Sequence, residues 1–426
     1  MTTPSPPSAD ASRRIGRSPS YLLAILVLVN TFNFVDRNIV SVLLNQIKAD
    51  FSATDEQMGL LTGAVFMVVH SIMGIPFARW ADRGTRRTVI AIGLTVWSAM
   101  TALSGYARSF TVLVFLRMGV GIGEASGAPA SHSMISDAFP PERRAGALAI
   151  YGLGIYLGIM FGYLGAGWIG QALGWRLTFV VLGAPGLLLA LLVAFTVPEP
   201  QRSAGAAAHP FGEVVGFLLR QRAYVWLLFA ASFHAASAYS VAIWSPSLLI
   251  RVHDFSLPEV GTALGLVTGI VGGTGGVLGG LWADRLSRSD RRGYARVTAS
   301  AAFVSVPAAA GFALAGDAAI ALLCFAPLIF ATGVYTGPIY AMNQFLAKPR
   351  MRGMSVAIHL FVVSIVGGGV GPWAVGRLSD TLGADLGDEA IRYALLIVAA
   401  TGAFLAGVFY LLAAKTLRED VERAQA

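Results

Sequence analysis

The chain contains twelve runs of apolar residues, each long enough to cross a lipid bilayer as an α-helix. A bilayer core of about 30 Å takes about 20 helical residues, because each residue advances the helix by about 1.5 Å. The runs lie near residues 20–44, 57–78, 88–107, 110–136, 146–169, 177–197, 222–250, 259–280, 295–315, 318–345, 354–377 and 390–414. The sequence therefore predicts an all-α integral membrane protein with twelve transmembrane helices.

Composition agrees with this fold class and gives the chain an orientation. Charged residues make up 13% of the chain, against roughly a quarter in a soluble domain. A net charge of +8 would also suit nucleic acid, but basic residues of multi-pass proteins collect in cytoplasmic loops. With a cytoplasmic N-terminus, the outer side holds only Lys48, Arg108, Arg176, Arg251, Arg377 and Arg392 of the 31 basic residues. We therefore expect both termini to be cytoplasmic and no nucleic acid to bind.

The source and the cofactor content follow from residue usage. The Arg-, Ala- and Gly-rich composition is typical of a high-GC bacterium, so we expect the protein in the inner (plasma) membrane. The single cysteine, Cys324, excludes an intrachain disulfide and a two-cysteine metal site within one chain. We expect no cofactor and no metal.

A repeated stretch divides the chain into two halves. "WADR" begins at Trp80 and again at Trp282, with arginines following both times. The copies lie about half the chain length apart, each in the loop after the second span of a six-span half, which indicates duplication. We expect two pseudo-symmetric six-helix bundles with these boundaries: a disordered cytoplasmic tail 1–19, a first bundle 20–197, a cytoplasmic linker 198–221, a second bundle 222–414 and a cytoplasmic tail 415–426.

The repeated loops are expected to act at the inner membrane face. The aspartate can bond to the amide end of a neighbouring helix, while the arginines pair with carboxylates or lipid phosphates. We expect these loops to form a cytoplasmic gate that closes when the central cavity faces outward. The gate residues are Asp82, Arg83, Arg86, Arg87, Asp284, Arg285 and Arg288.

These motifs resemble those of the major facilitator superfamily of transporters. Its loop signature of glycine, three residues, aspartate, arginine and further basic residues is matched by Gly280, Asp284, Arg285 and Arg288. The first copy departs from it, with Ala78 in place of the leading glycine. Arg117 followed by "GVGIGEASGAP" is similar to the fourth-span signature, and "GWR" at Gly174 is a further shared element.

About 180 residues of the first half resemble the Spinster branch of this superfamily. The matching stretches are "NFVDRNIVSVLL", "GVGIGEASGAPASHSMISDAFPPERRAGAL" and "GIYLGIMFGYLGAGWIG". The resemblance implies a carrier of lipid-type substrates such as sphingosine phosphate or lysophospholipids, working as a single chain.

A few ionisable residues lie inside the spans, where each costs roughly 2.5–3.5 kcal/mol to insert and is therefore a candidate functional group. They are Asp36 and Arg37 in the first span, with Asn33 a turn earlier, and Arg117 and Glu124 in the fourth. The two groups lie at similar depths, so we expect Asp36 or Arg37 to contact Arg117 and Glu124. Either arginine can receive an anionic head group while Glu124 or Asp36 exchanges a proton. The alternative is a permanent clasp that only joins two helices.

The second half offers a different surface, with few amides and many aromatic residues. Sugar hydroxyls need many amide partners, so a sugar substrate is disfavoured. We expect an aromatic and apolar cavity wall for the tail of an amphiphile, although each residue can equally serve in helix packing. The candidates are His234, Tyr239, Trp244, Tyr335, Tyr340 and His359.

Glycine spacing indicates close helix packing. Gly154, Gly158 and Gly162 recur every four residues, as do glycines from Gly261 to Gly273, so neighbouring helices can approach closely. The run "VGGGVGPW" at Val366 predicts a bend in the eleventh span.

The sequence thus predicts a proton-coupled secondary carrier of an amphiphilic anionic lipid, operating by alternating access among membrane lipids. The alternatives are a carrier of a small organic anion or of a hydrophobic drug. A channel would need a continuous polar lining, which is not visible. Ser131, His132 and Ser133 superficially resemble catalytic chemistry, but adjacent residues point in different directions around a helix. We therefore expect no enzyme.

Overall fold

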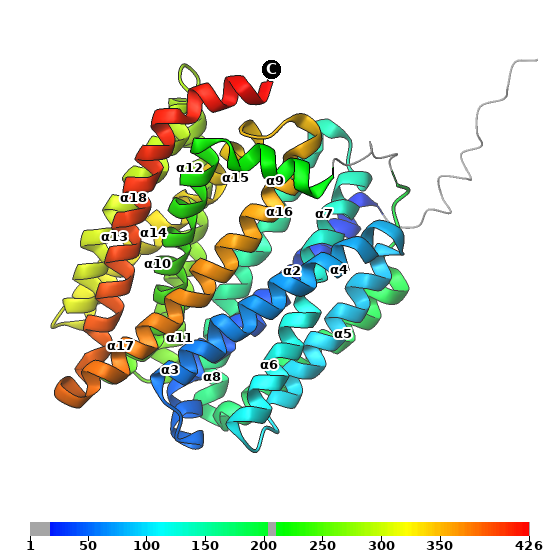
Figure 1. Cartoon of the computed structure of the whole chain (residues 1–426). Helices are drawn as coiled ribbons and strands as arrows, with labels where there is room; N and C mark the ends of the chain where they lie inside the picture. The colour runs from blue at the N-terminus through cyan, green and yellow to red at the C-terminus, as the bar shows by residue number, and fades with distance from the viewer. Residues whose placement is uncertain (1–17, 203–209, 426) are drawn as a thin grey trace, which may run out of the picture.

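The computed structural model describes residues 18–202 and 210–425, and throughout these residues the regular secondary structure is helical (Figure 1). Ten helical stretches are long and apolar enough to cross a membrane. Two of them contain two crossings each, joined at Gly174 with φ 75° and at Gly387 with φ 56°. Glycine adopts positive φ without the steric cost that a side chain brings, so both tight reversals depend on it. The ten stretches therefore make twelve crossings.

The first half contains crossings one to six. Its helices are α2 (Pro19–Phe51), α3 (Asp55–Thr62), α4 (Ala64–Arg83), α5 (Arg86–Ser104), α6 (Phe110–Glu124), α7 (Gly127–Ala138) and α8 (Pro141–Thr196). The second crossing is broken between α3 and α4, and the fourth between α6 and α7.

The second half repeats this pattern. Its elements are α10 (Arg222–His253), α11 (Leu257–Leu266), η1 (Val267–Gly272), α12 (Gly273–Leu286), α13 (Arg292–Leu314), α14 (Ala318–Val334), α15 (Thr336–Phe345), η2 (Pro349–Met351), α16 (Arg352–Val363), η3 (Ser364–Gly369), α17 (Val370–Leu386), η4 (Gly387–Glu389) and α18 (Ala390–Gln425). Its second and fourth crossings are interrupted as well, which agrees with a duplication. The predicted bend at Val366 falls in η3, which is a π-helical segment. The segment η1 is π-helical as well.

Residues 1–17 and 203–209, which cover most of the predicted N-terminal tail and part of the predicted linker, lie outside the described residues. The described part of the linker includes a short helix, α9 (Phe211–Leu219). The last helix, α18, runs on to Gln425 through the predicted C-terminal tail, and the Asp420 carboxylate accepts a hydrogen bond from the backbone N–H of Ala223 (2.7 Å).

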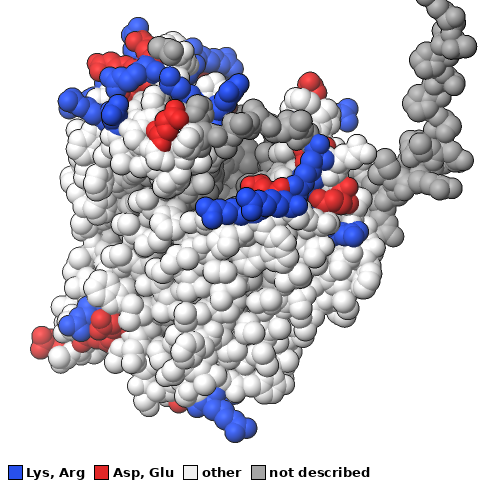
Figure 2. All heavy atoms as spheres, turned by 45° about the vertical axis from the view of Figure 1, so that its right-hand side comes forward, with Lys and Arg blue, Asp and Glu red and all other residues white. Residues whose placement is uncertain are grey.

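Charged side chains gather at the two ends of the molecule, and a broad uncharged belt separates them (Figure 2). We call the end where α2 begins and α18 ends the termini face, and the opposite end the far face. The belt is the surface that the bilayer covers, because lipid tails cannot solvate charge.

The hydrophobic core is shared between the halves at the far face only. One cluster of buried residues combines both halves and includes Leu43, Phe179, Trp244 and Phe312. Towards the termini face, the core separates into a first-half cluster around Trp97 and a second-half cluster around Tyr224. The halves are therefore packed together at the far face and divided towards the termini face.

Glycines allow a close approach between the halves at α8 and α11, as their spacing predicted. An added Cβ on Gly261 of α11 would lie 2.5 Å from the Tyr163 carbonyl oxygen and 3.0 Å from the Gly167 Cα of α8. Within the first half, a Cβ on Gly158 would lie 2.4 Å from the Thr31 carbonyl oxygen of α2. No larger residue fits at either contact without moving a backbone.

Candidate functional site

An ion pair inside the first half joins α2 to α6. The Arg37 Nε donates to Glu124 Oε2 at 2.6 Å, and the Glu124 side chain is fully buried. Arg37 lies near the middle of α2, and Glu124 ends α6 near the middle of the fourth crossing, Phe110–Ala138. The expected contact between the first and fourth spans is therefore present, and Arg37 makes it.

The other two embedded charges have no such direct partner. Asp36 is 1% exposed, and neither of its carboxylate oxygens has a hydrogen-bond partner among the described residues. Arg117 is 3% exposed, and its Nε and one terminal nitrogen also lack one. Asp36 interacts electrostatically with both Glu124 and Arg117, so the four groups form one cluster. Asn33, a turn before Asp36, is 7% exposed.

Two side chains that the sequence reasoning missed support the arginines from α4. The Phe66 ring lies 5.0 Å from the Arg37 guanidinium carbon and 5.5 Å from that of Arg117. Its negative face attracts both cations. The His70 ring stacks on Phe66, and its Nε2 lies 3.4 Å from a terminal nitrogen of Arg37. The available signal was their spacing of four residues, which places both on one face of a helix.

A cavity of about 100 Å³ borders this cluster. Both arginines line it from the first half, and Tyr239, Ala242 and Ile243 of α10 line it from the second. The remaining lining is mainly apolar: Phe34, Val40, Phe66, Met67 and Ile159, with Asn38, Ser41 and Thr62 as the other polar residues. Most of the apolar lining therefore belongs to the first half, as the arginines do, and α10 completes the cavity from the second half.

Comparison with known proteins places this architecture in a family. The family model of the Major Facilitator Superfamily matches residues 26–372, which is most of the chain. The chain belongs to the Major Facilitator Superfamily. Like its other members, it is a multi-pass membrane transporter and not an enzyme.

Three relatives define its position within the superfamily. The chain is 37% identical over 402 residues to an MFS-type efflux pump of Mycolicibacterium smegmatis, covering 94% of this chain and 93% of the relative. It is 26% identical to a sphingosine-1-phosphate transporter of Danio rerio, covering 96% and 86%. A crystal structure of a bacterial homologue of the human lysosomal transporter Spinster, inward-facing and unoccupied, matches with a TM-score of 0.83 and 28% identity, covering 94% and 98%. The chain is thus a Spinster-like member of the superfamily.

The predicted second-half residues of this superfamily member fall in different places. Tyr239 borders the cavity opposite the arginines. His234 is 2% exposed, and its ring lies 4.0 Å from the ring of Tyr335, while neither of its nitrogens has a hydrogen-bond partner in the described structure.

Of the six candidates only Tyr239 is among the residues that line this cavity, and the other five lie outside its lining. Trp244 is fully buried and donates to the Pro372 carbonyl at 2.9 Å. Tyr340 is 38% exposed, and His359 is buried with its Nδ1 unpartnered among the described residues.

The two repeated loops lie at the termini face. The first loop bonds to its own bundle and to the start of the linker, and the second loop bonds to its own bundle. Arg86 is 1% exposed and bonds to Glu199 at 2.8 Å, to Ser133 at 2.9 Å and to Asp137. The Arg87 backbone N–H donates to Glu199 at 2.9 Å. Asp284 accepts from the Tyr294 hydroxyl at 2.8 Å, which is a side chain and not a helix amide. Asp82, Arg83, Arg285 and Arg288 are exposed.

We expect the Arg37–Glu124 pair to show strong coupling in a double-mutant cycle of thermal unfolding. Glu124→Leu leaves the Arg37 cation without its carboxylate in a buried site and should destabilise the protein by about 3–5 kcal/mol. Arg37→Met/Glu124→Leu removes both charges and should recover most of that loss. Additive effects of the two single changes would show that the pair does not balance the charge of this site.

Proposed function

We propose that the protein is a proton-coupled carrier of an amphiphilic anion, with Arg117 as the first contact of the anionic head group. The observation that carries this proposal is the buried Arg117 guanidinium, which borders the cavity with two nitrogens unpartnered in the described structure. A buried cation without a hydrogen-bonded partner is costly, and an incoming phosphate or carboxylate supplies that partner. Arg37 is already engaged by Glu124, so Arg117 has the greater unmet demand.

An amphiphile fits a cavity whose lining combines two arginines with apolar side chains. The head group meets the arginines, while a hydrocarbon tail extends along Ile159, Tyr239 and Ile243 at the boundary between the halves. The similarity to a sphingosine-1-phosphate transporter supports the same substrate class.

A small organic anion is the second candidate, because about 100 Å³ accommodates a head group but is smaller than a typical ligand pocket. A hydrophobic drug is the third candidate, and an efflux pump is among the relatives. An uncharged drug, however, supplies no anionic partner for the Arg117 guanidinium.

Asp36 is the proton carrier in this proposal. An ionised carboxylate without hydrogen-bond partners is costly to bury, so Asp36 holds a proton before an anion binds. When an anion occupies Arg117, the charge balance around Asp36 and Glu124 changes, and proton release or uptake is linked to substrate. We further propose that the termini face is cytoplasmic, because basic residues gather there.

Neutralising Arg117 should remove anion recognition. We expect Arg117→Gln to weaken dodecyl phosphate binding to the purified protein at least about 10-fold, since a charge-assisted bond is worth about 1.5–3 kcal/mol. The matched control is Arg108→Gln, an exposed arginine just before the same helix, which should change binding less than about 2-fold.

The same binding series separates the substrate classes. An amphiphile carrier binds dodecyl phosphate more tightly than ethyl phosphate, whereas equal binding of the two favours a small organic anion. Binding of dodecanol as tight as that of dodecyl phosphate, or unchanged binding by Arg117→Gln, would contradict a head-group site at Arg117.

Proton coupling should depend on Asp36. In proteoliposomes, we expect Asp36→Asn to retain counterflow exchange of dodecyl phosphate but to lose accumulation driven by an imposed pH gradient. Glu124→Gln is measured in parallel, because it removes the other carboxylate of the cluster. If gradient-driven accumulation survives in both variants, neither carboxylate carries the coupled proton.

A further inference from the structure

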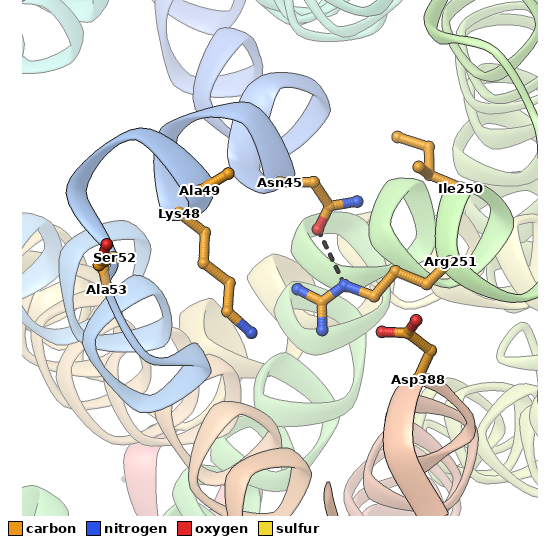
Figure 3. A pocket seen from close by; sticks show the side chains of 8 residues that line it. All are labelled: Asn45, Lys48, Ala49, Ser52, Ala53, Ile250, Arg251 and Asp388. Carbon is orange, nitrogen blue, oxygen red and sulfur yellow. Dashed lines mark hydrogen bonds between the residues drawn. The ribbon is translucent and has the colours of Figure 1, made fainter.

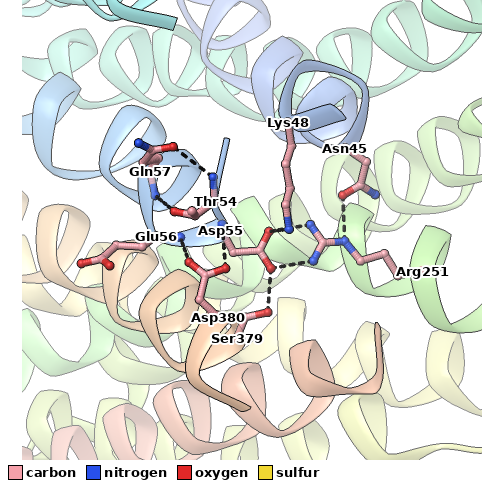
Figure 4. A network of polar contacts seen from close by, with 9 residues as sticks. All are labelled: Asn45, Lys48, Thr54, Asp55, Glu56, Gln57, Arg251, Ser379 and Asp380. Atoms are coloured by element: carbon pink, nitrogen blue, oxygen red, sulfur yellow. Dashed lines mark hydrogen bonds and ion pairs between the residues drawn. The ribbon is translucent and has the colours of Figure 1, made fainter. Parts of the chain in front are cut away.

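A polar network joins the two halves at the far face (Figure 4). The Arg251 guanidinium, at the end of α10, donates to both carboxylate oxygens of Asp55 at 2.7 and 2.8 Å. The Asp55 side chain is 4% exposed and that of Arg251 is 12% exposed. A two-pronged arginine–carboxylate pair of this kind is both strong and specific in geometry.

Further contacts surround this pair. Lys48 donates to Asp55 at 2.6 Å, Ser379 donates to it at 2.7 Å, and the Asn45 side-chain oxygen accepts from Arg251 at 2.9 Å. The Asp380 carboxylate accepts from the backbone N–H groups of Asp55 (3.0 Å) and Glu56 (2.7 Å), so α17 caps the first turn of α3 across the halves.

The partners divide unequally between the halves. Asn45, Lys48 and Asp55 belong to the first half, whereas Arg251 and Ser379 belong to the second. Lys48–Asp55 is therefore the one bond of this group that lies within a single half. If the halves part at the far face, Asp55 keeps Lys48, but Arg251 loses both Asp55 and Asn45.

A second carboxylate stands beside Arg251. Asp388, in η4 of the second half, lines the same pocket of about 540 Å³ as Lys48 and Arg251, and Figure 3 shows its carboxylate beside the Arg251 side chain. Among the described residues, Arg251 forms its ion pair with Asp55 and not with Asp388. Because both residues belong to the second half, they stay together when the halves separate.

We propose that Arg251 exchanges partners during the transport cycle, binding Asp55 when the far face is closed and Asp388 when it is open. The inference rests on the proposed alternating access between the two halves. In the closed state, Lys48 and Arg251 share Asp55, with Asp388 nearby. In the open state, each half retains a neutral pair, Lys48–Asp55 in the first and Arg251–Asp388 in the second. Opening therefore leaves each of these four charged groups with a partner of opposite sign in its own half.

This arrangement gives the two carboxylates opposite effects on one equilibrium. Asp55→Asn removes the ionic partner of Arg251 in the closed state and shifts the population towards an open far face. Asp388→Asn removes the partner that Arg251 needs in the open state and shifts the population towards the closed far face. If the two carboxylates acted only through the net charge of the pocket, both substitutions would shift the open fraction in the same direction.

The test measures distances across the far face in the full-length protein in lipid nanodiscs. Spin labels at Tyr106→Cys and Gly316→Cys, two exposed far-face positions in opposite halves, are introduced with Cys324→Ser. Pulsed electron paramagnetic resonance then gives the fraction of molecules with the longer, open distance. Asp385→Asn, which neutralises an exposed carboxylate of α17 outside the pocket lining, is the matched control.

We expect Asp55→Asn to raise the ratio of open to closed molecules at least about 10-fold, since it breaks a buried ion pair. Asp388→Asn should lower that ratio about 2-fold to 5-fold, the size expected of an exposed ion pair. Where the wild type is almost fully closed, Asp388→Asn is added to Asp55→Asn and should reduce the open fraction relative to Asp55→Asn alone.

A rise or no change in the open fraction on adding Asp388→Asn, or an effect equal to that of Asp385→Asn, would overturn the partner exchange. These distances are measured without substrate or pH gradient, so they are independent of whether Arg117 binds an anion. If the protein does not bind the anion but Asp55→Asn and Asp388→Asn still shift the open fraction in opposite directions, the proposed substrate is rejected and the partner exchange of Arg251 is retained.

Discussion

The structure depends on keeping charge inside a membrane at an acceptable cost. Arg37 and Glu124 achieve this by direct contact at 2.6 Å, with the Phe66 ring against the guanidinium. Breaking such a pair from one side leaves a buried charge, so the pair also fixes how α2, α4 and α6 are arranged. Asp36 and two nitrogens of Arg117 lack hydrogen-bond partners in the described structure, and the proposed response to an anion and a proton rests on this difference.

The packing of the two halves determines how the charge cluster is enclosed. Both halves contribute to one core at the far face, where Gly167 and Gly261 let α8 and α11 approach closely, and the core divides towards the termini face. The charge cluster lies in the first half, on a cavity that α10 completes from the second. In the proposed transport cycle, a rigid movement of one half against the other changes access to the cluster without dismantling it.

Much of this could be predicted from sequence because the membrane imposes strong constraints. Twelve apolar runs, the repeated "WADR" stretch and charges at matching depths predict the fold and the proximity of Arg37 to Glu124. Which arginine is unpartnered could not be predicted, because it depends on side-chain packing. Phe66 resembles any apolar residue of a span, and nothing in the sequence marks its proximity to two guanidinium groups. The Asp55–Arg251 pair joins residues 196 apart that read as ordinary loop charges.

The most direct test of the account is an experimental structure of the protein with bound dodecyl phosphate. The account predicts phosphate oxygens within hydrogen-bond distance of the Arg117 guanidinium and the alkyl chain along α10, with the Arg37–Glu124 pair retained. A phosphate bound away from Arg117, or an Arg117 fully paired with Asp36 in the presence of ligand, would contradict it.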